Sequence, residues 1–304
     1  AASIGQVHRA ETPVGCVLAL KIQYPGVRQS IDSDVANLGL LARLPTPGPA
    51  RPDPTPMLER IRMQLHRETD YAAEAASLTA YREALGDDPV LTVPQVQADY
   101  CTATILATDF ATGIAIDRLA DPAQPRAHRD HVAAALTRLS VREFFEMRLV
   151  QTDPNFGNYL FDADSGRIAL IDFGATEVVS PRLVEQLRSL GRALRDGDAA
   201  RSRAMSIDIG FIAEGDPPAQ SQGLLDIMQL ASDPLRHAGP YDFAASDHFK
   251  RSFAQGRAQF FGAGFARTPP PDILFLQRKF AGMFLMCARL GARVDLAEVF
   301  GAQL

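Results

Sequence analysis

The chain has 304 residues, of which 46% are apolar and 22% are charged, and its formal net charge is −5. These values are close to the globular average, so they exclude a disordered, collagen-like or disulfide-scaffold protein. The length suffices for one large domain or for two lobes. Because the charges are mixed and provide no broad basic face, we expect no nucleic-acid partner.

In chain order, the first predicted elements are two strands, Gln6–Ala10 and Val17–Tyr24, joined by a turn at Thr12–Gly15. A helix is predicted over residues 30–44, in which Ile31, Val35, Leu38, Leu41 and Leu44 share one face. The proline-rich run Pro45–Pro56 cannot hold helical or sheet hydrogen bonds, so we expect an exposed loop.

A second helix is predicted from Pro56 to Leu85, followed by strands at Thr92–Gln97 and Thr102–Thr108. We place a lobe boundary at the Asp109–Gly113 connection, giving a small lobe over residues 1–112 and a larger lobe over residues 113–304. From Arg129 onward the chain is predicted to be mostly helical. Two short strands interrupt it, Tyr159–Phe161 and Ile168–Ile171. The expected fold class is therefore α+β.

Only three residues are lysines, Lys21, Lys250 and Lys279, among 31 basic residues. Lys21 lies within the apolar strand, where an unpaired buried ammonium group is costly, so it needs an anionic partner. The alternative is a lysine at a strand end that extends to water. Glu74, on the predicted second helix, is the candidate partner, although any one acidic residue there is more often solvated.

Asp153 and Asn158 have the D-x-x-x-x-N spacing, and Asp172-Phe173-Gly174 follows a hairpin. In phosphoryl transfer a carboxylate orients the attacking group, and oxygen ligands hold Mg²⁺. Lys21, Glu74, Asp153, Asn158 and Asp172 occur in the chain order of a protein kinase. The glycine-rich phosphate loop is absent, however, and Gln151 stands where the H-R-D motif would begin.

The cysteines Cys16, Cys101 and Cys287 are far apart and form no C-x-x-C pair, so we expect reduced, buried thiols in a cytosolic setting. We interpret His128 and His131 as part of a solvated helix face and not as metal ligands. The longest apolar stretches, such as residues 282–288, are shorter than the roughly 18 residues that a membrane-spanning helix needs.

Several segments together resemble the UbiB (AarF) family of atypical kinases, in the branch associated with coenzyme Q biosynthesis. They are Ala1–Ala10, Leu18–Gly26, Glu68–Ala75, Gln151–Phe161, Ala169–Thr176 and Leu276–Val294. The resemblance implies a bilobal protein-kinase-like fold in which an alanine-rich loop, here Ala1, Ala2 and Ser3, replaces the glycine-rich one. It also implies an amino-terminal extension, with a lysine-glycine-glutamine motif that engages Glu68, and this chain is expected to begin after it.

By position, the resemblance implies that Lys21 contacts the ATP phosphates and pairs with Glu74. Asp153 then takes the catalytic-base position, and Asn158 and Asp172 hold Mg²⁺. Thr108, Asp109, Phe110 and Gly113 belong to the hinge beside adenine.

The expected function is an ATP- and Mg²⁺-dependent atypical kinase or ATPase that supports ubiquinone biosynthesis. Two alternatives stay open: a nucleotide-sensing scaffold without phosphoryl transfer, and a small-molecule phosphotransferase of the aminoglycoside-kinase type. Besides ATP, the expected partners are a membrane surface, quinone precursors or coenzyme Q biosynthetic enzymes. The expected location is cytoplasmic, peripheral to the inner membrane.

Overall fold

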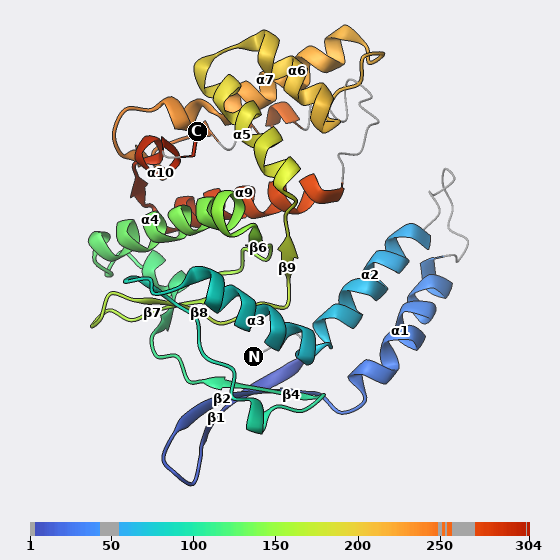
Figure 1. The fold of residues 1–304 in the computed structure, drawn as a ribbon, viewed down its shortest axis with the longest axis vertical. Helices are drawn as coiled ribbons and strands as arrows, with labels where there is room; N and C mark the ends of the chain where they lie inside the picture. Colours follow the sequence, from blue (N-terminus) through green and yellow to red (C-terminus); the bar gives the residue numbers. More distant parts are fainter. Residues whose placement is uncertain (1–3, 43–54, 249–250, 253, 257–270, 302) are drawn as a thin grey trace. The chain divides into compact units, whose positions relative to one another are not determined.

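A computed structural model describes residues 4–42, 55–248, 251–252, 254–256, 271–301 and 303–304 (Figure 1). Contacts divide the chain into two compact units. The first comprises Ala1–Asp88, Thr92–Thr112 and Ala169–Ala175, and the second comprises Pro89–Leu91, Gly113–Ile168 and Thr176–Leu304. The expected lobes, 1–112 and 113–304, differ from this division because residues 89–91 and 169–175 each belong to the other unit.

The first unit contains an antiparallel sheet of order β1-β2-β4, formed by Gly5–Glu11, Val17–Gln23 and Ile105–Asp109. The predicted hairpin is confirmed, and its turn closes through a hydrogen bond from the Gly15 N–H to the Thr12 carbonyl at 2.9 Å. Gly15 has φ +85°, a conformation that favours glycine. In this sheet β2 is the central strand, so its residues have neighbours on both sides.

Two helices of the first unit, α1 (Val27–Ala42) and α2 (Thr55–Glu68), pack side by side (Figure 1). Of the predicted loop Pro45–Pro56, residues 45–54 lie outside the described part of the chain, and Thr55 and Pro56 belong to α2. Residues 43 and 44, the last two of the predicted helix over 30–44, also lie outside the described part of the chain.

The single helix predicted from Pro56 to Leu85 is wrong, because the chain forms α2 and then α3 (Tyr71–Leu85). Asp70 separates them: its side chain accepts a hydrogen bond from the Ala73 N–H at 3.0 Å and so caps α3. The Thr69 carbonyl accepts from the Gln23 side chain at 2.6 Å, which fixes the break against β2. An aspartate within a helical pattern favours this alternative because its side chain competes for backbone N–H groups.

The predicted strand Thr92–Gln97 is also wrong for most of its length. Only Leu91–Thr92 forms β3, and Val96 makes an isolated bridge to Thr108. Pro94 lies between them and has no N–H for a sheet ladder. The predicted strand Thr102–Thr108 begins three residues late, as β4, after a bridge between Thr102 and Ile105.

The second unit begins with short strands. The chain forms β5 (Ile114–Ala115) and β7 (Tyr159–Phe161), which pair antiparallel within a four-stranded sheet of order β3-β8-β7-β5, where β8 is Ile168–Leu170. A separate pair joins β6 (Leu149–Gln151) to β9 (Thr176–Val178). The chain passes from the second unit to the first within β8, between Ile168 and Ala169.

The rest of the second unit is mainly helical. Its helices include α4 (Arg126–Arg142), α5 (Pro181–Asp196), α6 (Ala199–Ile209), α7 (Pro218–Ala231), α9 (Pro271–Leu290) and α10 (Leu296–Gly301). A small pair of strands, β10 (Tyr241–Asp242) and β11 (Arg293–Val294), accompanies them. Helices α4 and α9 pack against each other (Figure 1).

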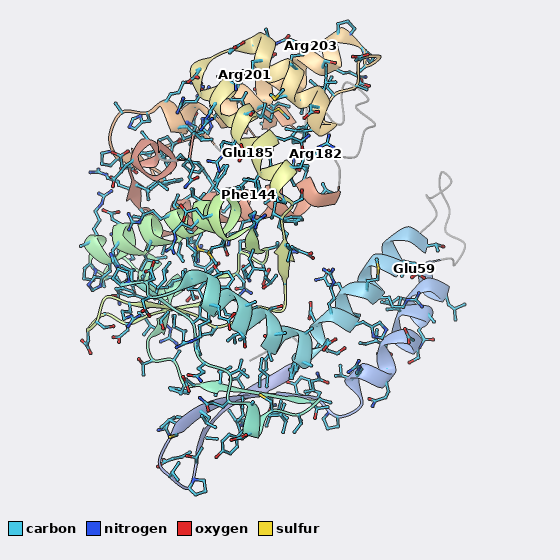
Figure 2. The ribbon with its side chains drawn as sticks, viewed as in Figure 1. Glu59, Phe144, Arg182, Glu185, Arg201 and Arg203 are labelled. Atoms are coloured by element: carbon cyan, nitrogen blue, oxygen red, sulfur yellow. The ribbon has the colours of Figure 1, made fainter. Side chains whose placement is uncertain are left out.

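An apolar core joins α5, α6, α7 and α9. It includes Phe144, Val150, Val184, Ile212 and Leu276. On α5, Arg182 and Glu185 are exposed while the residues between them are buried, the pattern expected of a helix with one face in the core (Figure 2). Phe144 belongs to the core from the single π-helical turn Glu143–Met147 that follows α4 (Figure 2).

The cysteines follow the prediction only in part: all three are free, but Cys287 is buried, Cys101 is half-buried and Cys16 is exposed. His128 and His131 are half-buried beside the Phe161 ring, with centroid distances of 5.1 and 6.2 Å, so the predicted solvated face is wrong. Within the described residues, no helix is both long and apolar enough to cross a membrane.

Candidate functional site

Lys21 lies on the central strand β2, opposite Val7 of β1 and Leu106 of β4. Its Nζ donates to both carboxylate oxygens of Glu74, at 2.7 and 2.8 Å, and lies 3.6 Å from Oδ2 of Asp172. The ammonium group also lies 5.3 Å from the centre of the Tyr71 ring. The ammonium group of Lys21, on a largely apolar strand, therefore has two carboxylates as neighbours.

Glu74 lies on the buried face of α3. The buried residues of this helix are Tyr71, Glu74, Leu78, Tyr81 and Leu85, which recur every three or four positions. The carboxylate thus occupies one place in an otherwise apolar or aromatic stripe. This position distinguishes Glu74 from Glu83, the other acidic residue of the same helix, which is exposed.

The ionisation of the pair follows from its burial and its charges. Burial by itself lowers the pKa of Lys21, but the Glu74 and Asp172 carboxylates outweigh it, so the pKa of Lys21 lies above its ordinary value. Burial raises the pKa of Glu74, and the adjacent Lys21 ammonium opposes this rise. With a protonated amine against both of its oxygens, Glu74 forms a buried ion pair at neutral pH.

Asp172 belongs to the segment 169–175, which the first unit contains. Its Oδ1 accepts a hydrogen bond from the Gly174 N–H at 3.1 Å, and Oδ2 faces Lys21. The next residue, Phe173, is buried, and its ring centre lies 4.8 Å from that of Tyr81 on α3. Phe173 therefore fixes the segment, and its neighbour Asp172 keeps a side chain that is 38% exposed.

Asp153 and Asn158 lie together in the second unit. The Asn158 side-chain amide donates to the Asp153 backbone carbonyl at 3.1 Å and to Asp153 Oδ2 at 3.2 Å. Asn155 stabilises the turn between them by accepting from the Gly157 N–H at 2.9 Å. The D-x-x-x-x-N spacing therefore corresponds to one compact loop in which the aspartate and the asparagine touch.

Sequence reasoning missed two residues of this loop's surroundings, Arg278 and Lys279 of α9. Arg278 Nη2 donates to Asp153 Oδ1 at 2.6 Å. Lys279 Nζ lies 2.6 Å from Glu143 Oε2, and both side chains are buried. The scarcity of lysine could have identified Lys279, because it interrupts the apolar face of α9 in a chain that otherwise uses arginine.

The remaining candidates are the predicted hinge residues, and their backbone groups have different partners. The Asp109 N–H donates to Gln95 and the Phe110 N–H to Val17, at 3.0 and 3.2 Å, so these two amides already have backbone partners. Thr108 pairs with Ala19 in the sheet. Gly113 has φ +123°, and a Cβ there would lie 2.7 Å from the Phe161 carbonyl oxygen, so this position requires glycine.

Ala1, Ala2 and Ser3 lie outside the described residues. Glu68 accepts from the Gln64 side chain at 3.3 Å, and Asp70 is engaged as the cap of α3. The structure thus brings Lys21, Glu74 and Asp172 together in the first unit. It brings Asp153 and Asn158 together in the second.

Comparisons with known proteins identify the family of the chain. Residues 1–206 match the profile of the ABC1 atypical kinase-like domain. The chain is 36% identical over 300 residues to the mitochondrial atypical kinase COQ8B of Rattus norvegicus, covering 99% of this chain and 56% of that protein. It is 31% identical over 300 residues to the mitochondrial atypical kinase COQ8 of Saccharomyces cerevisiae, covering 99% and 60%.

The chain therefore spans a little over half the length of these relatives. Among solved structures, the complex of Rv3197 with erythromycin from Mycobacterium tuberculosis matches with a TM-score of 0.78 and 23% identity, covering all of this chain and 75% of the other. This match confirms the predicted mixed α+β, kinase-like fold. The profile and the relatives likewise confirm the predicted family: the chain belongs to the ABC1 (UbiB) family of atypical kinase-like proteins.

Proposed function

We propose that this protein binds ATP with Mg²⁺ and acts as an atypical kinase or ATPase that supports ubiquinone biosynthesis. The observation that carries the proposal is the position of Lys21, whose ammonium group contacts both oxygens of Glu74 and lies 3.6 Å from Asp172. A kinase uses this combination of lysine, helix glutamate and metal-binding aspartate to hold the nucleotide phosphates.

The residues present fit Mg²⁺ by their chemistry. Mg²⁺ prefers carboxylate and amide oxygens and retains several waters. Asp172 offers a half-exposed carboxylate, and the Asn158 side chain donates to Asp153 through its nitrogen, so its oxygen is not used in that bond. When bound, the ion neutralises charge on the phosphate oxygens.

In this proposal the protein's own residues have separate tasks. Lys21 binds the phosphates, and Glu74 holds its ammonium group in place. Asp153 is the base that orients the attacking hydroxyl group or water and accepts its proton. Asn158 fixes the Asp153 carboxylate through the contact at 3.2 Å.

The test is Mg-ATP binding by calorimetry together with phosphate release, for the wild-type chain and for Lys21→Ala and Asp172→Asn. A charged hydrogen bond is worth about 1.5–3 kcal/mol, so each variant should bind about 10- to 100-fold more weakly. Asp164→Asn, which makes the same carboxylate-to-amide change on the exposed hairpin turn, is the matched control and should bind normally. Unchanged binding in both site variants would contradict the assignment.

The ubiquinone role is tested by repeating the turnover assay with liposomes and phenolic quinone precursors. Faster phosphate release, or a phosphorylated precursor, supports the role. Nucleotide binding without any product under all these conditions would instead favour a nucleotide-sensing scaffold.

A further inference from the structure

Helix α9 contacts the loop that carries Asp153 at several places. Its residue Gly282 lies so close to Pro154 that an added Cβ would be 2.1 Å from the proline Cγ. Pro154 is the neighbour of Asp153, and a proline ring is not a flexible side-chain end that can move aside. The helix therefore requires glycine at this point in order to approach the loop.

Arg278 lies one turn earlier on the same helix and contacts Asp153 itself. Its Nη2 donates to Oδ1 at 2.6 Å, while the Asn158 amide donates to Oδ2 at 3.2 Å. One donor thus comes from α9 and the other from the loop, so the plane of the carboxylate is fixed from both sides. Each carboxylate oxygen has a further lone pair, so Asp153 can still accept a proton.

Lys279 is connected through side chains to residues on both sides of the same loop. It forms a buried ion pair with Glu143 at 2.6 Å, and Glu143 Oε1 accepts a hydrogen bond from the Gln151 N–H at 3.1 Å. Lys279 also forms a hydrogen bond with the side chain of Tyr159. Gln151 precedes Asp153, and Tyr159 follows Asn158, so this buried network holds the entry and the exit of the loop.

We propose that Arg278 is a positioning residue for phosphoryl transfer: it holds the Asp153 carboxylate in the orientation that the acceptor needs, from a helix that Lys279 and Gly282 fasten to the loop. This inference rests on the proposed function. The side chains of Arg278 and Asp153 are 53% and 34% exposed, so their ion pair contributes little to folding stability. Its role is therefore separable from the stability of the fold.

The experiment measures kcat and KM for ATP hydrolysis in the whole chain with Arg278→Ala and Arg278→Lys. Because a misplacement of about 1 Å can cost 10²-fold in rate, Arg278→Ala should lower kcat by about 10- to 100-fold. The KM for ATP should change by less than about twofold, since the residue does not bind nucleotide. Arg278→Lys should be intermediate, because an ammonium group keeps the charge but not the planar fork.

Arg289→Ala, an exposed arginine on the same helix, is the matched control and should keep the wild-type kcat. Adding guanidinium at millimolar concentration should restore part of the activity of Arg278→Ala and leave the control unaffected. Circular dichroism and the thermal midpoint should be the same for the three variants and the wild type.

Wild-type kcat in Arg278→Ala would overturn this inference and leave the proposed function standing. An equal loss in Arg289→Ala, or a loss without guanidinium rescue that accompanies a lower thermal midpoint, would assign the effect to folding and also overturn it. A wild-type chain that releases no phosphate would overturn the proposed reaction itself, and the inference with it.

Discussion

Two of the three lysines, Lys21 and Lys279, are each paired with a buried glutamate, and they occupy different units. In both cases burial lowers the pKa of the amine, and the neighbouring groups together more than compensate, so the pKa is raised. These groups are Glu74 and Asp172 for Lys21, and Glu143 and Tyr159 for Lys279. A compact ammonium group suits such sites because it needs less space than a guanidinium. The two pairs differ in setting, however: Lys21 also faces the half-exposed Asp172, whereas Lys279 and Glu143 are fully enclosed.

Removing one partner of the enclosed pair should be costly. We expect Lys279→Met to destabilise the protein by about 3–5 kcal/mol, because it leaves the Glu143 carboxylate buried without its counter-ion. The double variant Glu143→Leu/Lys279→Met should recover more than half of this loss, although the hydrogen bond to Gln151 is lost with it. Urea unfolding at pH 7 measures both, and a double variant that is as unstable as the single one would contradict the argument.

The pH dependence of this pair has a defined sign. Because the folded-state pKa of Lys279 is raised above 10.5, its contribution to stability is complete below that pH and is lost as the pH rises through the folded pKa. Comparing the wild type with Lys279→Met at pH 7 and at pH 11 should therefore show a smaller difference at the higher pH.

At the scale of the elements, α3 is the helix on which the contact between Lys21 and Glu74 depends, because it carries Glu74 one turn after its first residue. The Asp70 side chain caps that turn. We expect Asp70→Ala to cost about 1 kcal/mol of stability, since a helix N-cap contributes about that much. It should also weaken Mg-ATP binding, because the first turn of α3 positions the partner of Lys21.

Asp198→Ala provides a matched control for the cap, because Asp198 caps α6 of the second unit through the Arg201 N–H at 2.9 Å. The control should lose a similar amount of stability in urea unfolding and keep the wild-type affinity for Mg-ATP. Equal affinities in the two cap variants would show that the start of α3 does not control the Lys21 contact.

Some of these elements and contacts could be predicted from local sequence patterns, and others could not. Periodicity and motif spacing predicted the hairpin, the two short strands around Asp164 and the pairing of Lys21 with Glu74, because each depends on a local pattern or on a charge that must be neutralised. The same reasoning missed the break at Asp70, where a capping side chain overrides a helical pattern. It also missed the contacts of Arg278 with Asp153 and of Lys279 with Glu143, because contacts over 125 residues or more leave no spacing signal.

At the scale of the whole molecule, the two units are interleaved along the chain. The segment 169–175 follows the Asp153 loop in sequence, but it belongs to the first unit, to which it contributes Asp172 and the buried Phe173. A simple division after residue 112 therefore omits one segment of the first unit. We propose that the small lobe consists of residues 1–112 completed by this later segment.

A fragment comparison tests this proposal. Residues 1–112 alone lack Phe173, which packs against Tyr81 at 4.8 Å, as well as the buried Ala169 and Leu170. Loss of a buried phenylalanine costs about 3–5 kcal/mol, which is a large part of the 5–15 kcal/mol that typically stabilises a domain. We expect the fragment to show no cooperative urea transition.

The same fragment joined by a glycine-serine linker to residues 169–175 should regain one, because the linked segment restores Phe173. Phe173→Ala in the linked form is the control and should abolish the gain, whereas cooperative unfolding of residues 1–112 alone would show that the later segment is not needed.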